Sequence, residues 1–362
     1  MDLSRRRFDP AHLDLDWMTA ALRRGGVLLD DKVIALSCAP VGNGLVADSY
    51  RYALDYDRPI PGAPASLIGK FPALDPASRQ SGSTHRLYLK EVSFYQALAA
   101  TLPIRTPQAY LAEIDRATDE FVLLLEDLGP ARQGDQLGGC SLADARVAMA
   151  QAAALHAPRW GDPQLEALDW MALDPAQPGS NLDAMLPPIV AQFKARYAGE
   201  LESEFIGLID RLPDVVRRTR DDRSAPRTLQ HGDFRLDNVM FDIHGGREPM
   251  ATLDWQTVNV GPGLVDVAYF LSAALPPDAR RVHEGDLVRG YHTELLRRGV
   301  RDYDWDQCWR DYRRFAVHGI LMGVFSALSV ERTERGDALF LKMTRGACSQ
   351  ALDHRTFDFW PD

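Results

Sequence analysis

The segment at residues 229–242, LQHGDFRLDNVMFD, carries a dense polar stretch between two apolar runs. One His, two Asp, one Arg and one Asn occur between positions 231 and 238. A continuous strand rarely tolerates so many polar groups. The segment is therefore predicted to be a β-type excursion broken by a polar loop. Its expected partner is residues 250–258, MATLDWQTV, with a hairpin tip at residues 244–248.

Three side chains of this region suit the chemistry of a hard cation. Asp233 and Asn238 lie in the polar loop, and Asp254 follows sixteen residues after Asn238. Carboxylate and amide oxygens are ligands that Mg²⁺ prefers. The two acids can divide the work: one binds metal, and the other orients a hydroxyl nucleophile and accepts its proton, as phosphoryl transfer requires. The alternative is a structural loop in which Asp237 and Asn238 cap a turn.

The first part of the chain contains residues that a nucleotide site needs. Lys70 stands near the end of an expected strand, and Glu91 lies in the helix expected after it. A lysine that is held by a glutamate can contact nucleotide phosphates. Gly42, Asn43 and Gly44 join two expected β-runs, where the backbone could approach phosphate. A short Gly-X-Gly segment is equally typical of a hairpin turn.

Composition bounds the class of protein. The chain has 362 residues, 46% hydrophobic and 25% charged, which predicts a globular protein of two lobes or domains. Its net charge of −10 argues against binding to nucleic acid or an anionic membrane surface. The four cysteines form no CxxC pair, so we expect neither a zinc nor a disulfide framework and a reducing, cytoplasmic compartment. We expect no secretory signal and no membrane span, because no apolar run is long enough.

Hydrophobic periodicity predicts a β-rich first third and a mainly helical remainder. Strands or hairpins are expected within residues 33–56, 65–72 and 109–129, helices within 11–30, 85–102, 141–160, 182–220 and 315–330, and a polar loop at 73–84. Ser141 is the expected N-cap of the third helix, with Asp144 in its first turn. The apolar run from Phe121 to Leu125 is expected to be buried on both faces.

In their order along the chain, these elements resemble the protein-kinase-like small-molecule phosphotransferases of the aminoglycoside phosphotransferase superfamily. The nearest branch is the ecdysteroid-kinase-like one. The resemblance rests on Gly42-Asn43-Gly44, Lys70, Glu91, LLLEDLG (123–129), HGDFRLDN (231–238), LDWQ (253–256) and GPGLVDVAYFL (261–271). It implies an α+β, two-lobed protein-kinase-like fold. A β-rich nucleotide-binding lobe with one main helix would span residues 1–128, and a larger, mostly helical lobe with the catalytic loop and substrate pocket would span 129–362.

The resemblance also implies a role for each matching residue. Asp233 would position the substrate hydroxyl, Asn238 and Asp254 would bind Mg²⁺, Lys70 would contact the phosphates of ATP or GTP with Glu91 as its partner, and the backbone from Glu126 to Leu128 would bind the base. His231 and Asp266 are expected to be structural. Arg235 could touch phosphate or substrate, or pair with an acid. The third glycine of the protein-kinase loop is replaced by Ala47, which leaves the phosphate contacts of residues 42–44 open.

The expected function is ATP- and Mg²⁺-dependent transfer of the γ-phosphate to a hydroxyl of a small molecule. A pseudokinase-like protein that binds nucleotide or ligand is the alternative, and a metal-dependent hydrolase explains neither Lys70 nor the hinge-like strand. The aromatic-rich stretch at residues 303–319 has few clustered acids, which favours an apolar alcohol as acceptor. Its aromatic residues Trp305, Trp309, Tyr312 and Phe315 follow helical spacing and also suit a core.

Overall fold

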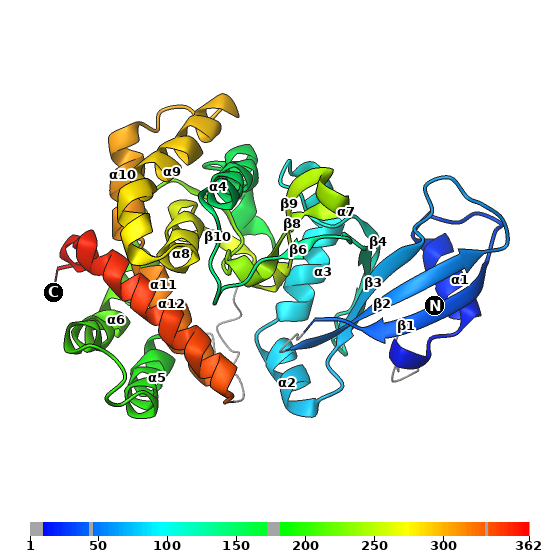
Figure 1. Ribbon diagram of the computed structural model, residues 1–362, viewed down its shortest axis with the longest axis horizontal. Coiled ribbons are helices and arrows are strands. Elements are labelled where there is room, and N and C mark those ends of the chain that lie inside the picture. The colour runs from blue at the N-terminus through cyan, green and yellow to red at the C-terminus, as the bar shows by residue number, and fades with distance from the viewer. Residues whose placement is uncertain (1–9, 43–45, 172–181, 330–331, 362) are drawn as a thin grey trace. The chain divides into compact units, whose positions relative to one another are not determined.

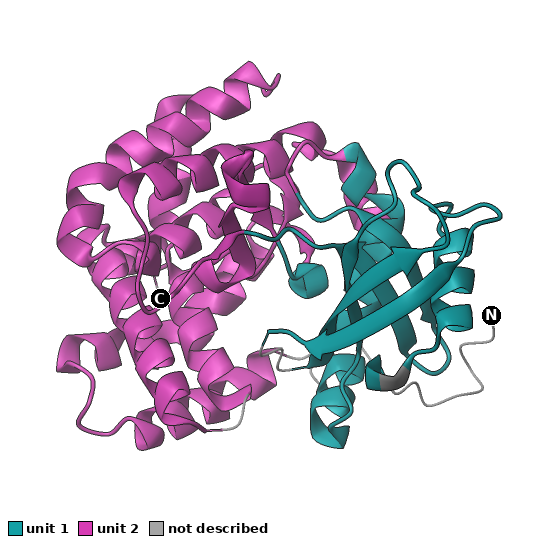
Figure 2. Ribbon diagram, turned by 45° about the vertical axis from the view of Figure 1, so that its right-hand side comes forward, with its two compact units in different colours: residues 1–101, 106–130, 253–257 teal, residues 102–105, 131–252, 258–362 magenta. Residues whose placement is uncertain are grey.

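The computed structural model describes residues 10–42, 46–171, 182–329 and 332–361, which form two compact units (Figures 1 and 2). Unit 1 comprises Met1–Thr101, Thr106–Pro130 and Leu253–Thr257. Unit 2 comprises Leu102–Arg105, Ala131–Thr252 and Val258–Asp362. Unit 1 therefore includes a short segment, 253–257, that is distant in sequence from the rest of the unit. No helix among the described residues is both long and apolar enough to cross a membrane.

Unit 1 is built on a five-stranded antiparallel sheet with the strand order β1-β2-β3-β5-β4. The strands are β1 (Val33–Pro40), β2 (Ala47–Tyr56), β3 (Ser66–Pro72), β4 (Ala109–Asp115) and β5 (Glu120–Glu126). The helices are α1 (Leu15–Arg24), α2 (Pro76–Thr84) and α3 (Leu87–Ala97). Residues 121–125 of β5 are all buried, as predicted from their uninterrupted apolar run. A core of apolar side chains from α1 and the sheet holds the unit together.

The prediction of a polar loop at residues 73–84 is wrong, because most of this segment forms α2. Asp75 caps this helix by accepting a hydrogen bond of 2.8 Å from the amide of Ser78. Pro76 occupies the first helical position, where its fixed φ favours helix and its missing N–H costs nothing. The local capping signal therefore outweighs the polar composition of the segment.

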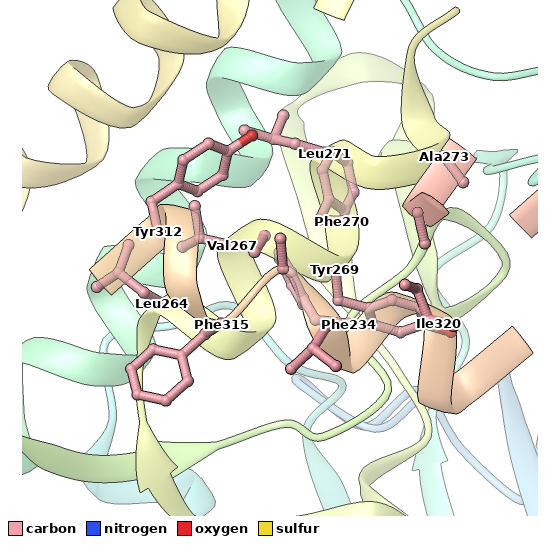
Figure 3. Close-up of a cluster of buried hydrophobic side chains, with 14 of the residues drawn as sticks. Phe234, Leu264, Val267, Tyr269, Phe270, Leu271, Ala273, Tyr312, Phe315 and Ile320 are labelled. Carbon is pink, nitrogen blue, oxygen red and sulfur yellow. The ribbon is translucent and has the colours of Figure 1, made fainter. Parts of the chain in front are cut away.

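Unit 2 is mainly helical (Figure 1). Its helices are α4 (Leu142–His156), α5 (Leu182–Arg196), α6 (Ser203–Asp221), α7 (Ile243–Gly246), α8 (Leu264–Ala274), α9 (Pro277–Arg297), α10 (Trp305–Arg314), α11 (Val317–Ser329) and α12 (Glu334–Asp353). Ser141 and Asp144 form a capping box at the start of α4, which confirms the predicted N-cap. Helix α8 is buried along nearly its whole length and lies at the centre of the core (Figure 3).

Short strands frame the polar loop of unit 2. They are β6 (Arg132–Gln133), β7 (Arg227–Gln230), β8 (Val239–Asp242), β9 (Glu248–Thr252) and β10 (Asn259–Pro262). Strands β8 and β9 pair antiparallel, as predicted. The rest of the predicted pairing is wrong: β9 ends at Thr252, and β7 pairs with β10 instead. The turn between β8 and β9 is one helical turn, α7, in which His244 and Gly245 have left-handed dihedral angles.

Candidate active site

The polar loop of unit 2 is anchored by a buried carboxylate, Asp266 of α8. Its Oδ2 accepts a hydrogen bond of 2.7 Å from the amide of His231, and its Oδ1 accepts one of 3.0 Å from the amide of Gly232. The backbone at Gly232 has φ of 82°, a left-handed conformation that glycine adopts without strain. His156 Nε2 lies 3.2 Å from the same Oδ2. These contacts give Asp266 the structural role that we expect for it.

Burial by itself would raise the pKa of the Asp266 carboxyl, but its donors outweigh this effect. The hydrogen bond and charge of His156, followed by the contacts of His231, leave the pKa below its usual value. The carboxylate is therefore ionised at neutral pH and holds the start of the loop to α8.

Asp233 is fixed by three side-chain donors of unit 2. Tyr269 donates its hydroxyl to Oδ1 at 2.9 Å, Asn238 donates Nδ2 to Oδ2 at 2.9 Å, and Arg235 Nε lies 3.2 Å from Oδ2. Asn238 also donates to the backbone carbonyl of Asp233 at 2.8 Å. The amide of Asp233 donates to Nδ1 of the buried His231 at 3.2 Å, which agrees with a structural role for that histidine. The result is a carboxylate of fixed orientation with a partly exposed side chain.

Arg235 pairs with acidic side chains, which is one of the roles expected for it. Besides Asp233, its guanidinium contacts Oδ2 of Asp237 at 2.7 Å. Burial opposes ionisation of Arg235, but Asp233 and the neighbouring hydroxyl and carboxylate groups raise its pKa. Gln136 completes this side of the loop: its amide donates to Asp237 at 2.9 Å, and its side-chain oxygen accepts from the amide of Leu236 at 2.8 Å.

Lys70 of β3 lies between two carboxylates of unit 1. Its Nζ is 2.7 Å from Glu91 of α3 and 2.7 Å from Asp254. The side chains of Lys70 and Glu91 are 14% and 2% exposed, so the pair is shielded from solvent. Burial acts to lower the pKa of Lys70, but the charges of Asp254 and Glu91 outweigh it and raise that pKa. The ammonium therefore stays charged, and the predicted Lys70–Glu91 pair is present.

Asp254 has a backbone conformation that is uncommon for a residue other than glycine. Its φ is 61°, in the left-handed region, where single residues such as Asp and Asn are tolerated at some cost in energy. The following residue explains how this conformation is held. The indole of Trp255 is fully buried, stacks on Phe94 at 3.9 Å between ring centroids, and donates to Thr106 at 3.0 Å. These contacts fasten segment 253–257 to unit 1.

Asn238 of unit 2 and Asp254 of unit 1 each carry side-chain oxygens of the kind that Mg²⁺ binds, and their role as its ligands stays a prediction. Asn238 uses its Nδ2 for Asp233, which leaves the side-chain Oδ1 as an oxygen ligand. Asp254 has two carboxylate oxygens, one facing Lys70 and the other accepting from Gln256 at 3.2 Å. The described residues include no group of three or more His, Cys, Asp or Glu side chains arranged to hold a metal.

In the segment predicted to bind the nucleotide base, residues 126–128, one backbone amide is already hydrogen-bonded and another has no partner among the described residues. The amide of Glu126 donates to the carbonyl of Gln108 at 2.8 Å within the sheet, so it does not face a base. The amide of the buried Leu128 has no partner within the described chain. Asp127 between them is held by Arg51 at 2.7 Å and by Ser66 at 2.7 Å. The amide of Leu128 can therefore donate to a base, whereas that of Glu126 cannot, and the base contacts of residues 126–128 stay a prediction.

Only part of the predicted glycine loop falls within the described residues. Gly42 ends the described segment with φ of 73°, a left-handed conformation. Asn43 and Gly44 lie outside the described residues. The phosphate contacts of this loop stay a prediction.

Several residues of the site are not predicted from the sequence. Tyr269 contacts Asp233 from α8, and His318 of α11 lies with Nε2 3.1 Å from the carbonyl of Gly232. Gln136 and Gln256 also bind the acids of the site. Each of these residues except Gln256 is more than thirty residues from its partner in sequence, and Gln136 contacts Asp237 through its backbone amide. Two of them lie in motifs that the sequence shows: Tyr269 shares GPGLVDVAYFL with Asp266, and Gln256 belongs to LDWQ (253–256).

Solved structures with the same fold are similar to this chain at low sequence identity. A protein from Ralstonia eutropha JMP134 regarded as an aminoglycoside phosphotransferase is 17% identical, with a TM-score of 0.56 over 95% of this chain and 99% of that one. Choline kinase from Cryptosporidium parvum Iowa II is 8% identical, with a TM-score of 0.54 over 90% and 93%. The GDP and kanamycin complex of an APH(2″) enzyme is 15% identical, with a TM-score of 0.50 over 87% and 91%. These similarities confirm the predicted α+β, kinase-like fold.

Sequence comparisons add a relative and a family. Acyl-CoA dehydrogenase family member 10 of Mus musculus is 32% identical over 115 residues, which cover 28% of this chain and 11% of the mouse protein. The match therefore spans only a small part of that protein. The family model described as "Phosphotransferase enzyme family" matches residues 62–308, which is more than half of the chain. The chain therefore belongs to the phosphotransferase enzyme family.

Proposed function

We propose that the protein transfers the γ-phosphate of ATP or GTP to a hydroxyl of a small molecule in a Mg²⁺-dependent reaction. The observation that carries the proposal is the fixed carboxylate of Asp233, which Tyr269, Asn238 and Arg235 hold in one orientation. Phosphoryl transfer depends mainly on positioning and charge neutralisation, and a fixed acid beside the acceptor hydroxyl supplies the positioning. Membership of the phosphotransferase family supports the same reaction class.

In this proposal the acceptor oxygen forms a bond to the γ-phosphorus while the bond from that phosphorus to the bridging oxygen breaks. Asp233 orients the acceptor hydroxyl and takes up its proton, which then passes to water. Lys70, held by Glu91, contacts the nucleotide phosphates. Asn238 and Asp254 would hold Mg²⁺, which would supply neutralisation of the phosphate charge. Residues 1–128 bind the nucleotide, and residues 129–362 bind the acceptor.

Recognition of the base is assigned to the segment that ends at Leu128. Its amide is open within the described chain and can donate to a ring nitrogen of a purine. A structurally similar APH(2″) enzyme holds GDP, so both adenine and guanine nucleotides belong in the first binding assays. The residues of the 42–44 loop would cover the phosphates.

We also propose that the acceptor is an apolar alcohol, as in an ecdysteroid-kinase-like branch of the family. Helix α11 starts beside the loop, since His318 contacts the carbonyl of Gly232. The half-buried side chains of Leu321, Met322 and Phe325 follow His318 along this helix. The sequence of α11, VHGILMGVFSALS, includes no acidic residue. In this proposal these side chains face the acceptor, and they favour an apolar molecule over a polycationic sugar, which requires acids for its amino groups.

A screen for acceptor-dependent ADP release tests the proposed function. The full chain would be incubated with Mg²⁺ and ATP or GTP and a panel of steroid and acyl alcohols, choline, kanamycin and simple hydroxylated metabolites. We expect nucleoside diphosphate release that requires both Mg²⁺ and an alcohol, with the strongest response among the apolar alcohols. Mg²⁺-dependent nucleotide binding with no release for any acceptor would favour the pseudokinase-like alternative. Release that is equal without acceptor would indicate a hydrolase and contradict the proposal.

A further inference from the structure

Tyr269 of α8 contacts Oδ1 of Asp233, whereas Asn238 and Arg235 contact Oδ2. The side chain is 2% exposed, and its O–H donates to Oδ1 of Asp233 at 2.9 Å. A buried hydroxyl needs a partner, but the partner here is the carboxylate to which the acceptor alcohol is assigned. The contact therefore bears on how Asp233 presents itself to the acceptor.

The two carboxylate oxygens of Asp233 differ in the number of hydrogen bonds that they receive. Oδ2 has two donors, Asn238 Nδ2 at 2.9 Å and Arg235 Nε at 3.2 Å. Oδ1 has one donor among the described residues, the hydroxyl of Tyr269. A carboxylate oxygen accepts two hydrogen bonds through its lone pairs. One acceptor position is therefore left, and it is on Oδ1, beside the tyrosine hydroxyl.

The position of the Tyr269 hydroxyl is itself determined by packing. Its ring belongs to the buried cluster that includes Phe234 and Ile320 (Figure 3). The ring of His318 meets it edge to face, with 5.4 Å between centroids and an interplanar angle of 89°. Nε2 of His318 in turn lies 3.1 Å from the carbonyl of Gly232, the residue before Asp233. The hydroxyl is thus fixed relative to the loop on which Asp233 stands.

The hydroxyl of Tyr269 remains a proton donor. Burial, together with the charge of Asp233, raises the pKa of Tyr269 well above its usual value. The phenol therefore keeps its proton beside the carboxylate and cannot act as a base. It is suited to orient Asp233 and not to take a proton from the acceptor.

We propose that Tyr269 is the positioning residue of Asp233: it fixes Oδ1, and the acceptor hydroxyl donates to the remaining acceptor position of that same oxygen. This inference rests on the proposed function. The acceptor proton passes to Oδ1 as the acceptor oxygen bonds to the γ-phosphorus. Without Tyr269 the carboxylate can rotate, and water can replace the acceptor at the γ-phosphate.

Tyr269→Phe tests the inference, with Tyr312→Phe as its matched control. Tyr312 is also a buried tyrosine of unit 2 whose hydroxyl donates to a carboxylate, Glu284 at 2.8 Å, but it lies outside the loop contacts. The best acceptor from the screen would be used to measure kcat, the KM for nucleotide, and the ratio of ADP formed to acceptor phosphorylated. For Tyr269→Phe we expect kcat to fall about 10- to 100-fold, the effect of one hydrogen bond to a charged group, with an unchanged nucleotide KM and a raised ratio. Tyr312→Phe should leave kcat and the ratio unchanged per folded molecule.

A double-mutant cycle separates positioning from a general loss of stability. If Tyr269 acts through Asp233, Tyr269→Phe should have no further effect on kcat in an Asp233→Asn background. Unchanged kcat and ratio in the single variant would overturn the inference. So would an equal loss in both tyrosine variants with an unchanged ratio, or additive effects in the double mutant. A wild-type protein that phosphorylates no acceptor would instead contradict the proposed function.

Discussion

At the residue scale, Asp254 combines an uncommon backbone conformation with a carboxylate that already faces Lys70. Its φ is 61°. Asparagine tolerates this conformation and keeps the shape of the side chain. Lys70 still has the carboxylate of Glu91 as a partner when residue 254 carries no charge. We therefore expect Asp254→Asn to fold normally, to bind nucleotide with a much weaker dependence on Mg²⁺, and to turn over about 10²–10³ times more slowly. Calorimetric titration with ADP, with and without Mg²⁺, measures the first effect.

Asp242 offers a matched control for that substitution. It also has a left-handed φ, 53°, but its side chain is 60% exposed and, among the described residues, pairs with the exposed Arg132. Asp242→Asn should leave both Mg²⁺ dependence and turnover unchanged. Equal Mg²⁺-dependent binding in Asp254→Asn and in the wild type would rule out Asp254 as a metal ligand.

The buried Asp266 predicts how stability responds to acid. Its folded-state pKa lies below the value of 3.8 for a free side chain, because His156 and the loop amides favour the carboxylate against the effect of burial. The stabilisation that it contributes is therefore fully present above about pH 4–5 and is lost as the pH falls through the lowered folded-state value. We expect Asp266→Asn to lower the free energy of unfolding by about 2–3 kcal/mol at pH 7 and by much less at pH 3. Urea unfolding at pH 7, 5, 4 and 3 measures this difference.

Asp183 provides a comparison for the acid response. Its pKa is also lowered, through a hydrogen bond from Arg220, but the pair is exposed on the surface. Asp183→Asn should leave the free energy of unfolding nearly unchanged at any pH, because solvent screens the pair. A constant difference between Asp266→Asn and the wild type from pH 7 to 3 would contradict the assigned role of Asp266.

Sequence reasoning reaches some of these residues because their neighbours along the chain are informative. Asp233 and Asn238 stand five residues apart in one loop, and the Lys70–Glu91 pair joins consecutive elements. The contact of Tyr269 is different: the residue lies in the same motif as Asp266, but only the packing of α8 against the loop brings its hydroxyl to Asp233. Contacts of this kind depend on the tertiary fold and carry no local pattern.

At the scale of elements, close packing around α12 holds α8 and α11 in place beside the loop. A Cβ added to Gly346 of α12 would lie 2.2 Å from the carbonyl oxygen of Ser272 in α8, and backbone cannot move away cheaply. We expect Gly346→Ala to lower the free energy of unfolding by about 1–3 kcal/mol, despite the higher helix propensity of alanine. Chemical denaturation of the two proteins measures the change.

Gly290 of α9 is the matched control, because it is a helical glycine with no atom within 4 Å of an added Cβ. Gly290→Ala should raise the free energy of unfolding by up to about 1 kcal/mol through helix propensity alone. The opposite signs expected for the two substitutions separate packing from propensity. A stabilising Gly346→Ala would mean that α12 and α8 are not closely packed there.

The errors at the element scale have identifiable causes. Helix α2 is missed because its polar composition indicates a loop, although Asp75 and Pro76 carry a helix start signal. Strand β9 ends before its predicted limit because Asp254 turns into the left-handed region and Trp255 packs on Phe94. Periodicity identifies apolar runs, but it does not show where tertiary packing ends a strand.

At the scale of the whole molecule, the order of motifs predicts the α+β, kinase-like fold, and the structural comparisons confirm it. Each motif is weak by itself, but their sequence order restricts the topology. The acceptor is much harder to predict, since the proposal for it rests on the side chains of one helix, α11, and not on a motif. Pocket composition varies within one fold, so fold alone does not identify a substrate.

The most direct test of the account is transfer of labelled γ-phosphate from Mg·ATP to the best acceptor by the wild type and by Asp233→Asn, in single turnover. Asparagine keeps the size of the side chain and can still contact Tyr269, but it cannot take up a proton. We expect label on the acceptor with the wild type, and a rate about 10²–10⁴ times lower with Asp233→Asn while nucleotide binding is retained. Equal transfer by the two proteins would contradict the central claim that Asp233 receives the acceptor hydroxyl.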